Sequence, residues 1–313
     1  MQLEFTVENH EAGIKLAAFL RRRRLSLGLV RSLKRQPMGL CVNGNRAKTT
    51  NQCLAAGDAV LLTLPLDTGL SAMPQNGPVH ILYKSQHALV VDKPPGMPMH
   101  PSPSHHAGTL ANFYSGLMQR TQGAGLFRPV GRLDTDTSGL VLCAGHVAAV
   151  PLLAASLQKT YLALVHGALV PEKGSFTGPL AAAPGSATRQ QVHPAGRPSH
   201  TDYRVLAVGQ GATLVAVFPR TGRTHQVRAH FAHAGHPLLG DALYGGPRDK
   251  MGRHALHCAR LVFTELDGQR RAISLAAPED MRYAAAACGI ELSAAHPEGP
   301  IAPAVEMQVP DIV

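Results

Sequence analysis

The stretch Gly131-Arg132-Leu133-Asp134-Thr135-Asp136-Thr137-Ser138-Gly139-Leu140 places two carboxylates and several hydroxyls directly before an apolar run at residues 140–143. The run predicts a buried strand, and the polar residues before it predict a loop at the end of that strand. Loops of this kind often carry functional side chains. A tight turn, in which Asp, Thr and Ser side chains bond to the backbone, would give the same local pattern. The rest of the chain must therefore decide between a site and a turn.

Further strand-like runs surround this loop. They lie at residues 88–91, 161–165, 203–208 and 213–218, and a helical pattern spans residues 109–117. The runs do not alternate regularly with helices, as they would in a parallel βαβ sheet. The sequence therefore predicts an α+β domain over residues 79–287.

The first 65 residues form a separate pattern. Residues 12–20 read as a helix, and Ser26 is placed to cap a second helix that ends before Pro37. Strands are predicted on both sides of Asn43-Gly44, a hairpin turn signal, and at residues 59–64. This order of helix, helix, hairpin and strand resembles the alpha-L RNA-binding domain of certain ribosomal proteins and RNA-modifying enzymes.

Positive charge is concentrated in this first segment. The chain of 313 residues has a formal charge of +10 and a pI near 9.7, which favours polyanionic partners. Residues 1–65 hold ten basic and four acidic side chains, a net charge of +6. Because ordinary surfaces intersperse both signs, we interpret the segment as a phosphate-binding module. Its expected RNA contacts are Arg21, Arg22, Arg23, Arg24, Lys34 and Arg35.

The remaining segments carry weaker signals. Residues 66–78 are rich in Gly, Pro, Ser and Asn and predict a linker, and residues 288–313 contain four prolines and no Lys or Arg and predict a disordered tail. No secretory or membrane-spanning segment is evident, so a cytoplasmic protein without membrane contact is expected. The five cysteines are scattered and form no CxxC pair, which indicates reduced, structural thiols.

A second polar segment runs from Thr221-Gly222-Arg223-Thr224-His225-Gln226-Val227-Arg228-Ala229-His230 to Tyr244-Gly245. Thr221 or Thr224 is expected to cap a helix whose N-terminus would favour an anion. His230 and His233 lie one helical turn apart and raise the question of a metal. The HExxH pattern is absent and no cysteine joins them, so no metal site is predicted.

Taken together, these segments resemble the RluA-type branch of the RNA pseudouridine synthases. Residues 93–101 (Lys93-Pro94, Gly96, His100-Pro101) are similar to its opening motif. Residues 132–139 are similar to its catalytic motif, and residues 159–163 (Lys-Thr-Tyr-Leu-Ala) to its third. The segment from residue 221 to 245 and the pair Leu256-His257 resemble its later signatures. The likeness extends from the first residues to about residue 275.

The resemblance implies a small active site. Asp134 matches the catalytic aspartate, which either attacks the anomeric carbon or removes the neighbouring 2′ proton of the sugar. Arg223 is taken as the arginine that pairs with this carboxylate, a role that would keep it ionised and oriented. Tyr161 matches the tyrosine that stacks on the target base. Arg132 and Lys159 are expected to contact RNA, whereas Asp136 is expected to be structural.

The resemblance also implies a mixed, largely antiparallel sheet with a central cleft, and a reaction without cofactor or metal. The uracil detaches, rotates and rejoins through its carbon five, and the target nucleotide must first leave its stack. Large-subunit ribosomal RNA is the preferred substrate because an N-terminal module of this kind accompanies enzymes that act on it; transfer RNA is the alternative. A monomer is expected, because the basic surface disfavours self-association.

Two departures from the family pattern stand out. Gly131 occupies a position at which this branch usually has His, and the interval from Asp134 to Lys159 is shorter than usual, which puts the placement of Tyr161 in doubt. An inactive RNA-binding or ribosome-assembly protein is a rival interpretation. A glycoside or nucleoside hydrolase is another, but it would need a second convergent carboxylate, and only Asp136 is near.

Overall fold

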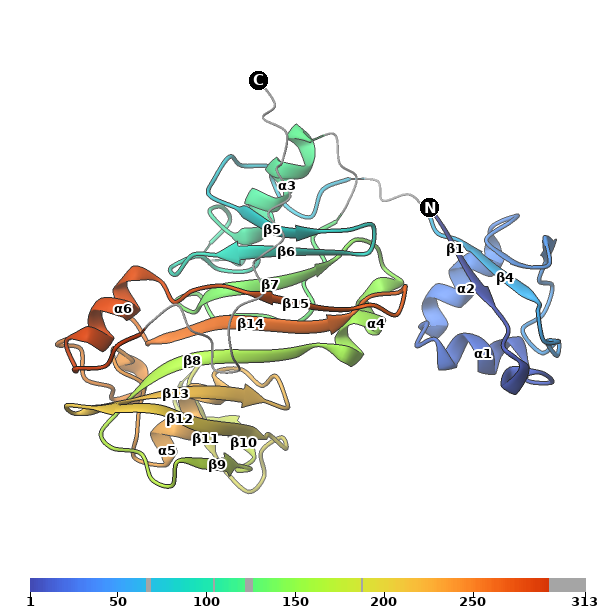
Figure 1. The fold of residues 1–313 in the computed structure, drawn as a ribbon. Helices are drawn as coiled ribbons and strands as arrows, with labels where there is room; N and C mark the ends of the chain where they lie inside the picture. The colour runs from blue at the N-terminus through green and yellow to red at the C-terminus, as the bar shows by residue number, and fades with distance from the viewer. Residues whose placement is uncertain (66–68, 104, 122–125, 187, 293–313) are drawn as a thin grey trace.

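The computed structural model describes residues 1–65, 69–103, 105–121, 126–186 and 188–292. Figure 1 shows a small unit formed by the first residues and a long twisted sheet formed by the rest. Within the described residues no helix is both long and apolar enough to cross a membrane.

The N-terminal unit contains the predicted elements and one strand that was not predicted. Its four-stranded sheet has the order β1 (Gln2–Thr6), β4 (Ala59–Thr63), β2 (Leu40–Val42) and β3 (Asn45–Arg46), and helices α1 (Leu16–Arg22) and α2 (Leu27–Arg35) pack on it. A short 3₁₀ helix, η1 (Asn9–Glu11), follows β1. Ser26 caps α2 as expected, accepting a hydrogen bond of 3.1 Å from the backbone N–H of Leu29. A core that includes Leu16, Phe19 and Leu33 holds the unit together.

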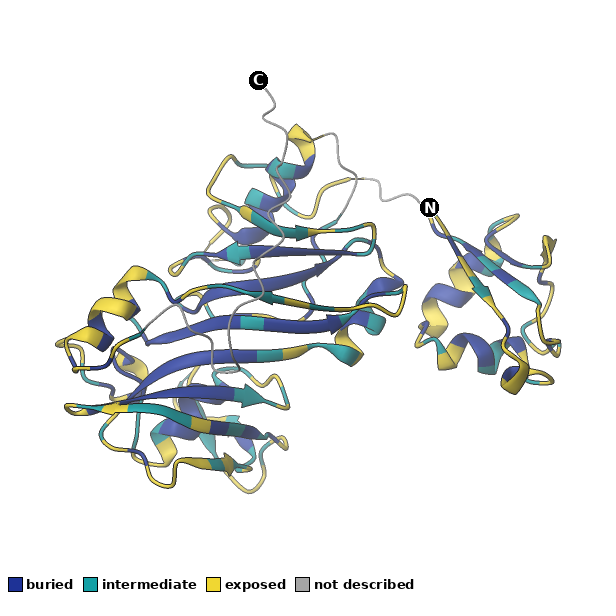
Figure 2. Ribbon diagram, viewed as in Figure 1, coloured by how far each residue is buried: buried dark blue, intermediate teal, exposed yellow. Residues whose placement is uncertain are grey.

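The large sheet has nine strands and is mixed but largely antiparallel, which confirms the expected fold class. Its order is β5 (His80–Lys84), β6 (Ala88–Lys93), β7 (Ser138–Ala144), β14 (Leu256–Thr264), β8 (Gln158–His166), β13 (Ala212–Pro219), β12 (Thr201–Gly209) and β9 (Lys173–Phe176), with β15 (Arg270–Ser274) paired to β14. The central strands are the most buried (Figure 2). Among the described strands, only the pair β7 and β14 is parallel.

Short elements border this sheet. They are α3 (Leu110–Arg120), α4 (Ala149–Ser156), α5 (Gln226–His233), α6 (Glu279–Ala286), the 3₁₀ helix η2 (Ala242–Tyr244) and a separate hairpin of β10 (Leu180–Ala182) and β11 (Gln190–Val192). Figure 1 shows α3 beside β5 at one end of the sheet, and α5 with the β10–β11 hairpin at the other. The centre of the sheet lies between these ends.

Gly139 explains why the polar loop can run directly into β7. Its φ is +110°, and a Cβ there would lie 2.3 Å from the carbonyl oxygen of Cys258 on β14. Only glycine tolerates both the backbone conformation and this approach. The parallel pairing of β7 with β14 therefore fixes where the loop that holds Asp134 ends.

Parts of the predicted linker and tail are packed. Asn112 on α3 donates to the carbonyl of Met73 (2.9 Å) and accepts from the backbone N–H of Gln75 through its own carbonyl (3.1 Å). Cys288 and Ile290 are buried against α6 and β12–β13, so the prediction of a tail beginning at residue 288 is wrong for the first of these residues. The predicted tail from residue 293 onward lies outside the described residues.

Candidate active site

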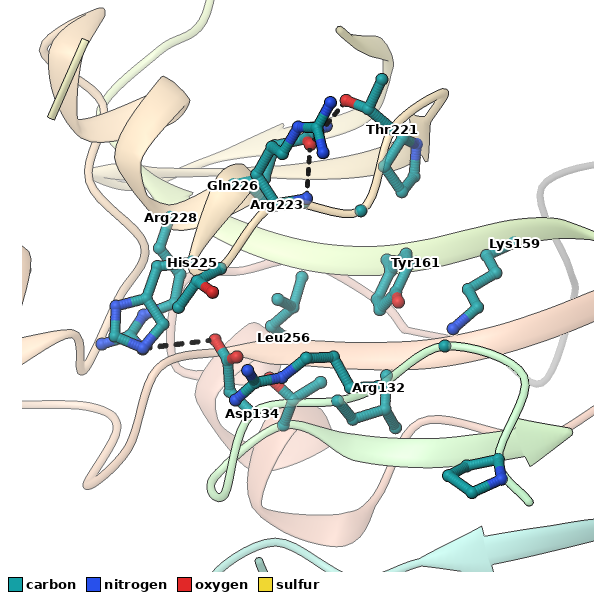
Figure 3. A pocket seen from close by; sticks show the side chains of 18 of the residues that line it. Arg132, Asp134, Lys159, Tyr161, Thr221, Arg223, His225, Gln226, Arg228 and Leu256 are labelled. Atoms are coloured by element: carbon teal, nitrogen blue, oxygen red, sulfur yellow. Dashed lines mark hydrogen bonds and ion pairs between the residues drawn. The ribbon is translucent and has the colours of Figure 1, made fainter. Parts of the chain in front are cut away.

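A cavity of about 570 Å³ lies over the centre of the sheet. Its lining comes mainly from the loop before β7, the start of β8, residues 219–228 from the end of β13 to the start of α5, and Leu256 on β14; His100, Ala154 on α4 and Leu157 complete it. Figure 3 shows the side chains that these segments direct toward it. The two motifs that dominate the sequence therefore meet at one place.

Asp134 stands at the floor of this cavity. Its carbonyl accepts a hydrogen bond of 3.1 Å from the backbone N–H of Thr137, which folds the loop as a turn, and its side chain remains 16% exposed. Lys93 secures the loop from below. The Lys93 Nζ is fully buried and donates to the carbonyls of Thr135 (2.8 Å), Met97 (2.8 Å) and Pro94 (2.9 Å). Burial lowers the pKa of Lys93 to about 7.

The cation beside Asp134 is Arg228, on the first turn of α5. Its Nη1 lies 3.4 Å from Asp134 Oδ2, while its Nε and Nη2 donate to the two oxygens of Asp241 at 2.7 and 2.8 Å. Burial acts to lower the pKa of Arg228, but the bonds to Asp241 outweigh it and raise this pKa. Asp241 thus holds the guanidinium in one orientation, with its remaining edge toward Asp134.

The predicted pairing of Arg223 with Asp134 is wrong in this structure. Arg223 lies in the loop before α5, is exposed, and donates through Nε to the carbonyl of Pro198 at 3.0 Å. Figure 3 shows its side chain on the side of the loop away from Asp134. The motif contains two arginines, and only the start of the helix at Gln226 decides which one faces the carboxylate. Asp241, the partner of Arg228, was the signal available in the sequence.

His225 was not predicted as a site residue, yet it joins the same cluster. It precedes α5 with a φ of +51°, its Nε2 lies 3.8 Å from Asp134 Oδ2, and its Nδ1 lies 3.3 Å from the Tyr244 hydroxyl. Burial lowers the pKa of His225. The predicted threonine cap is absent: Thr221 instead donates to Gln226 Oε1 at 2.7 Å. The Gln226 side chain also accepts a hydrogen bond of 3.0 Å from the backbone N–H of Arg223, so it closes the loop in place of a threonine cap.

Tyr161 and Lys159 line the wall opposite α5. They are two residues apart on β8, so both point to the same face of the strand, into the cavity (Figure 3). Burial raises the pKa of Tyr161 and lowers that of Lys159. The short interval from Asp134 to Lys159 contains strand β7 and helix α4, and Tyr161 still lies on the cavity wall.

Gly131 adjoins Lys159. Its φ is +90°, and a Cβ at this position would lie 2.9 Å from Lys159 Nζ. The space that a side chain at residue 131 would need is thus taken by the lysine. Arg132, the next residue, is exposed and also lines the cavity.

The cations of the N-terminal unit differ among themselves. Arg21, Arg22, Arg24 and Arg35 are exposed, and Lys34 is half-buried. Arg23 instead makes a double hydrogen bond to the buried carboxylate of Glu11, at 2.5 and 2.9 Å, and lies 3.8 Å from the centre of the Phe19 ring. Arg23 therefore stabilises the fold of the N-terminal unit, whereas the side chains of Arg21, Arg22 and Arg24 are exposed.

The structure gives His230 a role in packing. Its Nε2 lies within 2.9 Å of the carbonyl of Gly178 and 3.1 Å of Ser199 Oγ, and its Nδ1 lies 2.9 Å from Thr201 Oγ1. Over the residues that the structure describes, no three His, Cys, Asp or Glu side chains are grouped to hold a metal ion.

Comparison with known proteins agrees with this geometry. The model of the RNA pseudouridylate synthase family matches residues 87–233. An RNA pseudouridine synthase of Bacillus subtilis, YjbO, is 34% identical over 249 residues, which cover 77% of this chain and 88% of the relative. Ribosomal large subunit pseudouridine synthase D of Yersinia pestis is 32% identical over 77% of this chain and is matched over 80% of its own length. The structure of human RNA Pseudouridylate Synthase Domain Containing 1 superposes with a TM-score of 0.53 at 26% identity, over 63% of this chain and 82% of that one.

The chain belongs to the family of RNA pseudouridine synthases, the isomerases that convert uridine to pseudouridine in RNA. Within that family it falls in the RluA-type branch, as the motifs around Asp134 and His225 indicate.

Proposed function

We propose that this protein isomerises uridines in large-subunit ribosomal RNA and that Asp134 performs the chemistry. The observation that carries the proposal is the convergence of Asp134, Arg228 and Tyr161 on one cavity. Relatives named for the large ribosomal subunit, matched over most of their length, support the choice of RNA.

The arrangement suits a reaction at the sugar of a flipped nucleotide. The bond between the anomeric carbon and uracil N1 breaks, and a bond to uracil C5 forms; C5 loses its proton, and N1 gains one. Arg228 places a guanidinium 3.4 Å from the Asp134 carboxylate and so helps to orient it. The flat ring of Tyr161 offers a surface against which the detached uracil can turn.

Burial assists this chemistry. The pKa of Tyr161 is raised by burial, so its hydroxyl stays neutral at physiological pH and brings no second negative charge to the site. The pKa of His225 is lowered, so its ring is neutral there as well. Among the described residues that line the cavity, Asp134 is the one with a carboxylate, and the Arg228 guanidinium lies between it and Asp241.

The N-terminal unit is proposed to anchor the RNA. Its exposed arginines lie on and beside α1 and α2. The order of helix, helix, hairpin and strand in this unit supports its interpretation as an alpha-L domain. Phosphate contacts of this kind supply affinity without sequence choice. The net charge of +10 also disfavours self-association, and we propose that the protein acts as a monomer.

The test is release of tritium from RNA labelled at uracil carbon five, because isomerisation expels that hydrogen. Wild type should release tritium from a large-subunit ribosomal transcript. Asp134→Asn should slow release by about 1,000-fold or more while its affinity for RNA changes by less than about threefold, since affinity rests on phosphate contacts. A transfer RNA transcript serves as the comparison substrate. Release by Asp134→Asn at the wild-type rate would refute the assignment of Asp134.

An RNA-anchoring test uses the triple variant Arg21→Gln, Arg24→Gln, Arg35→Gln. The salt dependence of RNA binding should become shallower, by about one unit of slope for each phosphate that the variant no longer binds. Arg23→Gln is not a suitable control because Arg23 supports the fold; Lys173→Gln, on exposed β9, is. An unchanged slope in the triple variant would contradict the anchoring role.

A further inference from the structure

A second groove lies beside the active-site cavity and has a volume of about 380 Å³. Its walls are the β10–β11 hairpin with the turn that follows it, and residues 222–224 of the loop before α5. Gly222, Arg223 and Thr224 line both the groove and the cavity. Only these three residues separate the groove from the cavity. If the target nucleotide of an RNA strand enters the cavity, the neighbouring nucleotides of that strand therefore lie close to the groove.

The groove is positively charged. Arg197 and Arg223 line it from opposite walls, both are exposed, and none of its ten lining residues is acidic. Neither arginine forms an ion pair with a carboxylate among the described residues. Arg220, in contrast, is already paired: its Nε donates to Asp202 at 2.7 Å. The groove thus presents two guanidinium groups, the group best suited to hold a phosphate.

The hairpin wall is firmly attached. The backbone of Arg197 exchanges two hydrogen bonds with Leu180, at 2.8 and 2.9 Å. A Cβ on the preceding Gly196 would lie 2.6 Å from the carbonyl carbon of Leu180, which shows how closely the turn packs on β10. The Arg197 side chain consequently projects from a fixed backbone position.

Two side chains couple the hairpin to the active site. The Tyr244 hydroxyl accepts a hydrogen bond of 2.8 Å from the backbone N–H of Gln190 on β11, and its ring lies beneath Arg228, whose guanidinium carbon is 5.1 Å from the ring centre. At the other end of the hairpin, Ser199 donates to the carbonyl of Gly178 at 2.6 Å and contacts His230 of α5. The groove and Arg228 are therefore held in a constant geometry.

We propose that this groove binds the RNA backbone next to the target uridine, with Arg197 and Arg223 contacting a flanking phosphodiester. This inference rests on the proposed function, since it takes the occupant of the neighbouring cavity to be a uridine of an RNA chain. Arg223, which the structure separates from Asp134, then acts on the substrate beside the cavity. Flipping a nucleotide costs the energy of unstacking its base. A contact between the groove and the neighbouring backbone would offset part of this cost.

The first test compares Arg197→Ala with Lys173→Ala, which removes an exposed cation of β9 outside both cavities. Arg197 is exposed, so folding should not be affected. On a large-subunit ribosomal transcript, Arg197→Ala should raise KM about fivefold with kcat unchanged, and reduce the salt slope of binding by about one unit. Lys173→Ala should match wild type in both. A salt slope for Arg197→Ala equal to that of wild type would overturn the proposal.

The second test locates the phosphate. Once the modified uridine is mapped, a short RNA carries a neutral methylphosphonate at one of the two linkages that flank it. At one linkage the neutral group should weaken wild-type binding, and Arg197→Ala should then cause no further weakening. Effects that add independently at both linkages would refute the contact. Because the modified uridine is mapped first, wild-type activity is established before this test, and additive effects would refute the groove contact while the proposed function stands. If the wild type modifies no uridine, the proposed function fails, while the salt slope of binding in the first test, which needs no turnover, still tests the groove.

Discussion

The charges at the bottom of the active site and the charges around its rim are organised in opposite ways. At the bottom, Asp134, Arg228 and Asp241 are interlocked through short contacts, and Arg228 and Asp241 are buried. At the rim, Arg132, Arg197 and Arg223 are exposed. The charges at the bottom hold one another in a fixed geometry, whereas the arginines at the rim are free to face solvent.

This difference separates the groups that act in the reaction from those that bind the RNA. Buried ions are costly unless each has a partner, so the floor of the site is stable only as a complete set. Exposed cations cost little and are screened by salt, so each can be removed alone. We expect changes at the floor to affect turnover and stability together, and changes at the rim to affect affinity and its salt dependence.

Arg228→Met is expected to have the largest effect. It leaves the buried carboxylate of Asp241 without its cation, which should cost about 3–5 kcal/mol of unfolding free energy, and it removes the cation beside Asp134, which should lower kcat by about 100-fold or more. Urea unfolding and single-turnover tritium release measure the two effects. Arg223→Met is the matched control, with a change of less than about 0.5 kcal/mol and an unaltered kcat.

The double variant Arg228→Met, Asp241→Asn separates stability from chemistry. Replacing the uncompensated carboxylate by an amide should recover part of the unfolding free energy, whereas kcat should stay low because Asp134 still lacks its partner. If Arg223→Met reduced kcat as strongly as Arg228→Met, the assignment drawn from the structure would fail and the one drawn from the sequence would stand.

The fold could be predicted because it rests on local patterns, whereas the site residues rest on the resemblance of whole motifs to a family. The α+β class, the cap at Ser26 and the strand after Asp134 follow from apolar runs and turn residues. Asp134, Tyr161 and Lys159 were assigned through the resemblance, and all three line the cavity. Strand β1 was missed although its five residues alternate between polar and apolar types, a pattern typical of a half-buried strand. The segment is short, and pairing with β4 stabilises it.

The choice between Arg223 and Arg228 shows what local patterns leave undecided. Whether an arginine faces a carboxylate depends on where the helix begins and on a partner, Asp241, thirteen positions beyond Arg228. His225 adopts a left-handed conformation that sets this beginning. Histidine is one of the residue types enriched in that conformation, but most histidines do not adopt it, so the residue type alone does not predict it. The packed residues Cys288 and Ile290 were missed for a similar reason, since a proline-rich sequence after them suggested disorder.

Lys93 lies below the floor and links it to the fold. Lys93→Met removes the amine that lies within hydrogen-bond distance of three carbonyls. At pH 9, where a pKa of about 7 leaves a neutral amine with two N–H groups to donate, we expect a loss of about 1–3 kcal/mol in unfolding free energy. The loss should depend on pH. The folded pKa of about 7 lies below the unfolded value, so the unfolded state binds more protons between about pH 7 and pH 10. Wild-type stability should therefore rise over this range relative to the variant, by at most about 1.4 kcal/mol per pH unit.

Urea unfolding of both proteins from pH 6.5 to 9.5 measures this difference. A difference that is constant or falls as pH rises would show that Lys93 remains fully charged in the fold. Arg132→Ala is the rim control, because an exposed arginine should leave unfolding unchanged at every pH while weakening RNA binding.

Gly131→Ala should have the smallest effect on stability and activity. It tests whether Lys159, which adjoins Gly131, belongs to the reacting groups at the bottom of the site or to the RNA-binding cations at its rim. The φ of +90° strains any side chain, and the new Cβ would lie 2.9 Å from Lys159 Nζ, the mobile end of a side chain. We expect a loss of about 1–2 kcal/mol and a displacement of Lys159. Gly252→Ala is the control, because that glycine has no positive φ and open space around a Cβ. If Lys159 contacts RNA, Gly131→Ala should raise KM about twofold to threefold and leave kcat unaltered. A fall in kcat at constant KM would show that Lys159 acts in the reaction, like the charged groups at the bottom of the site, and not in RNA binding.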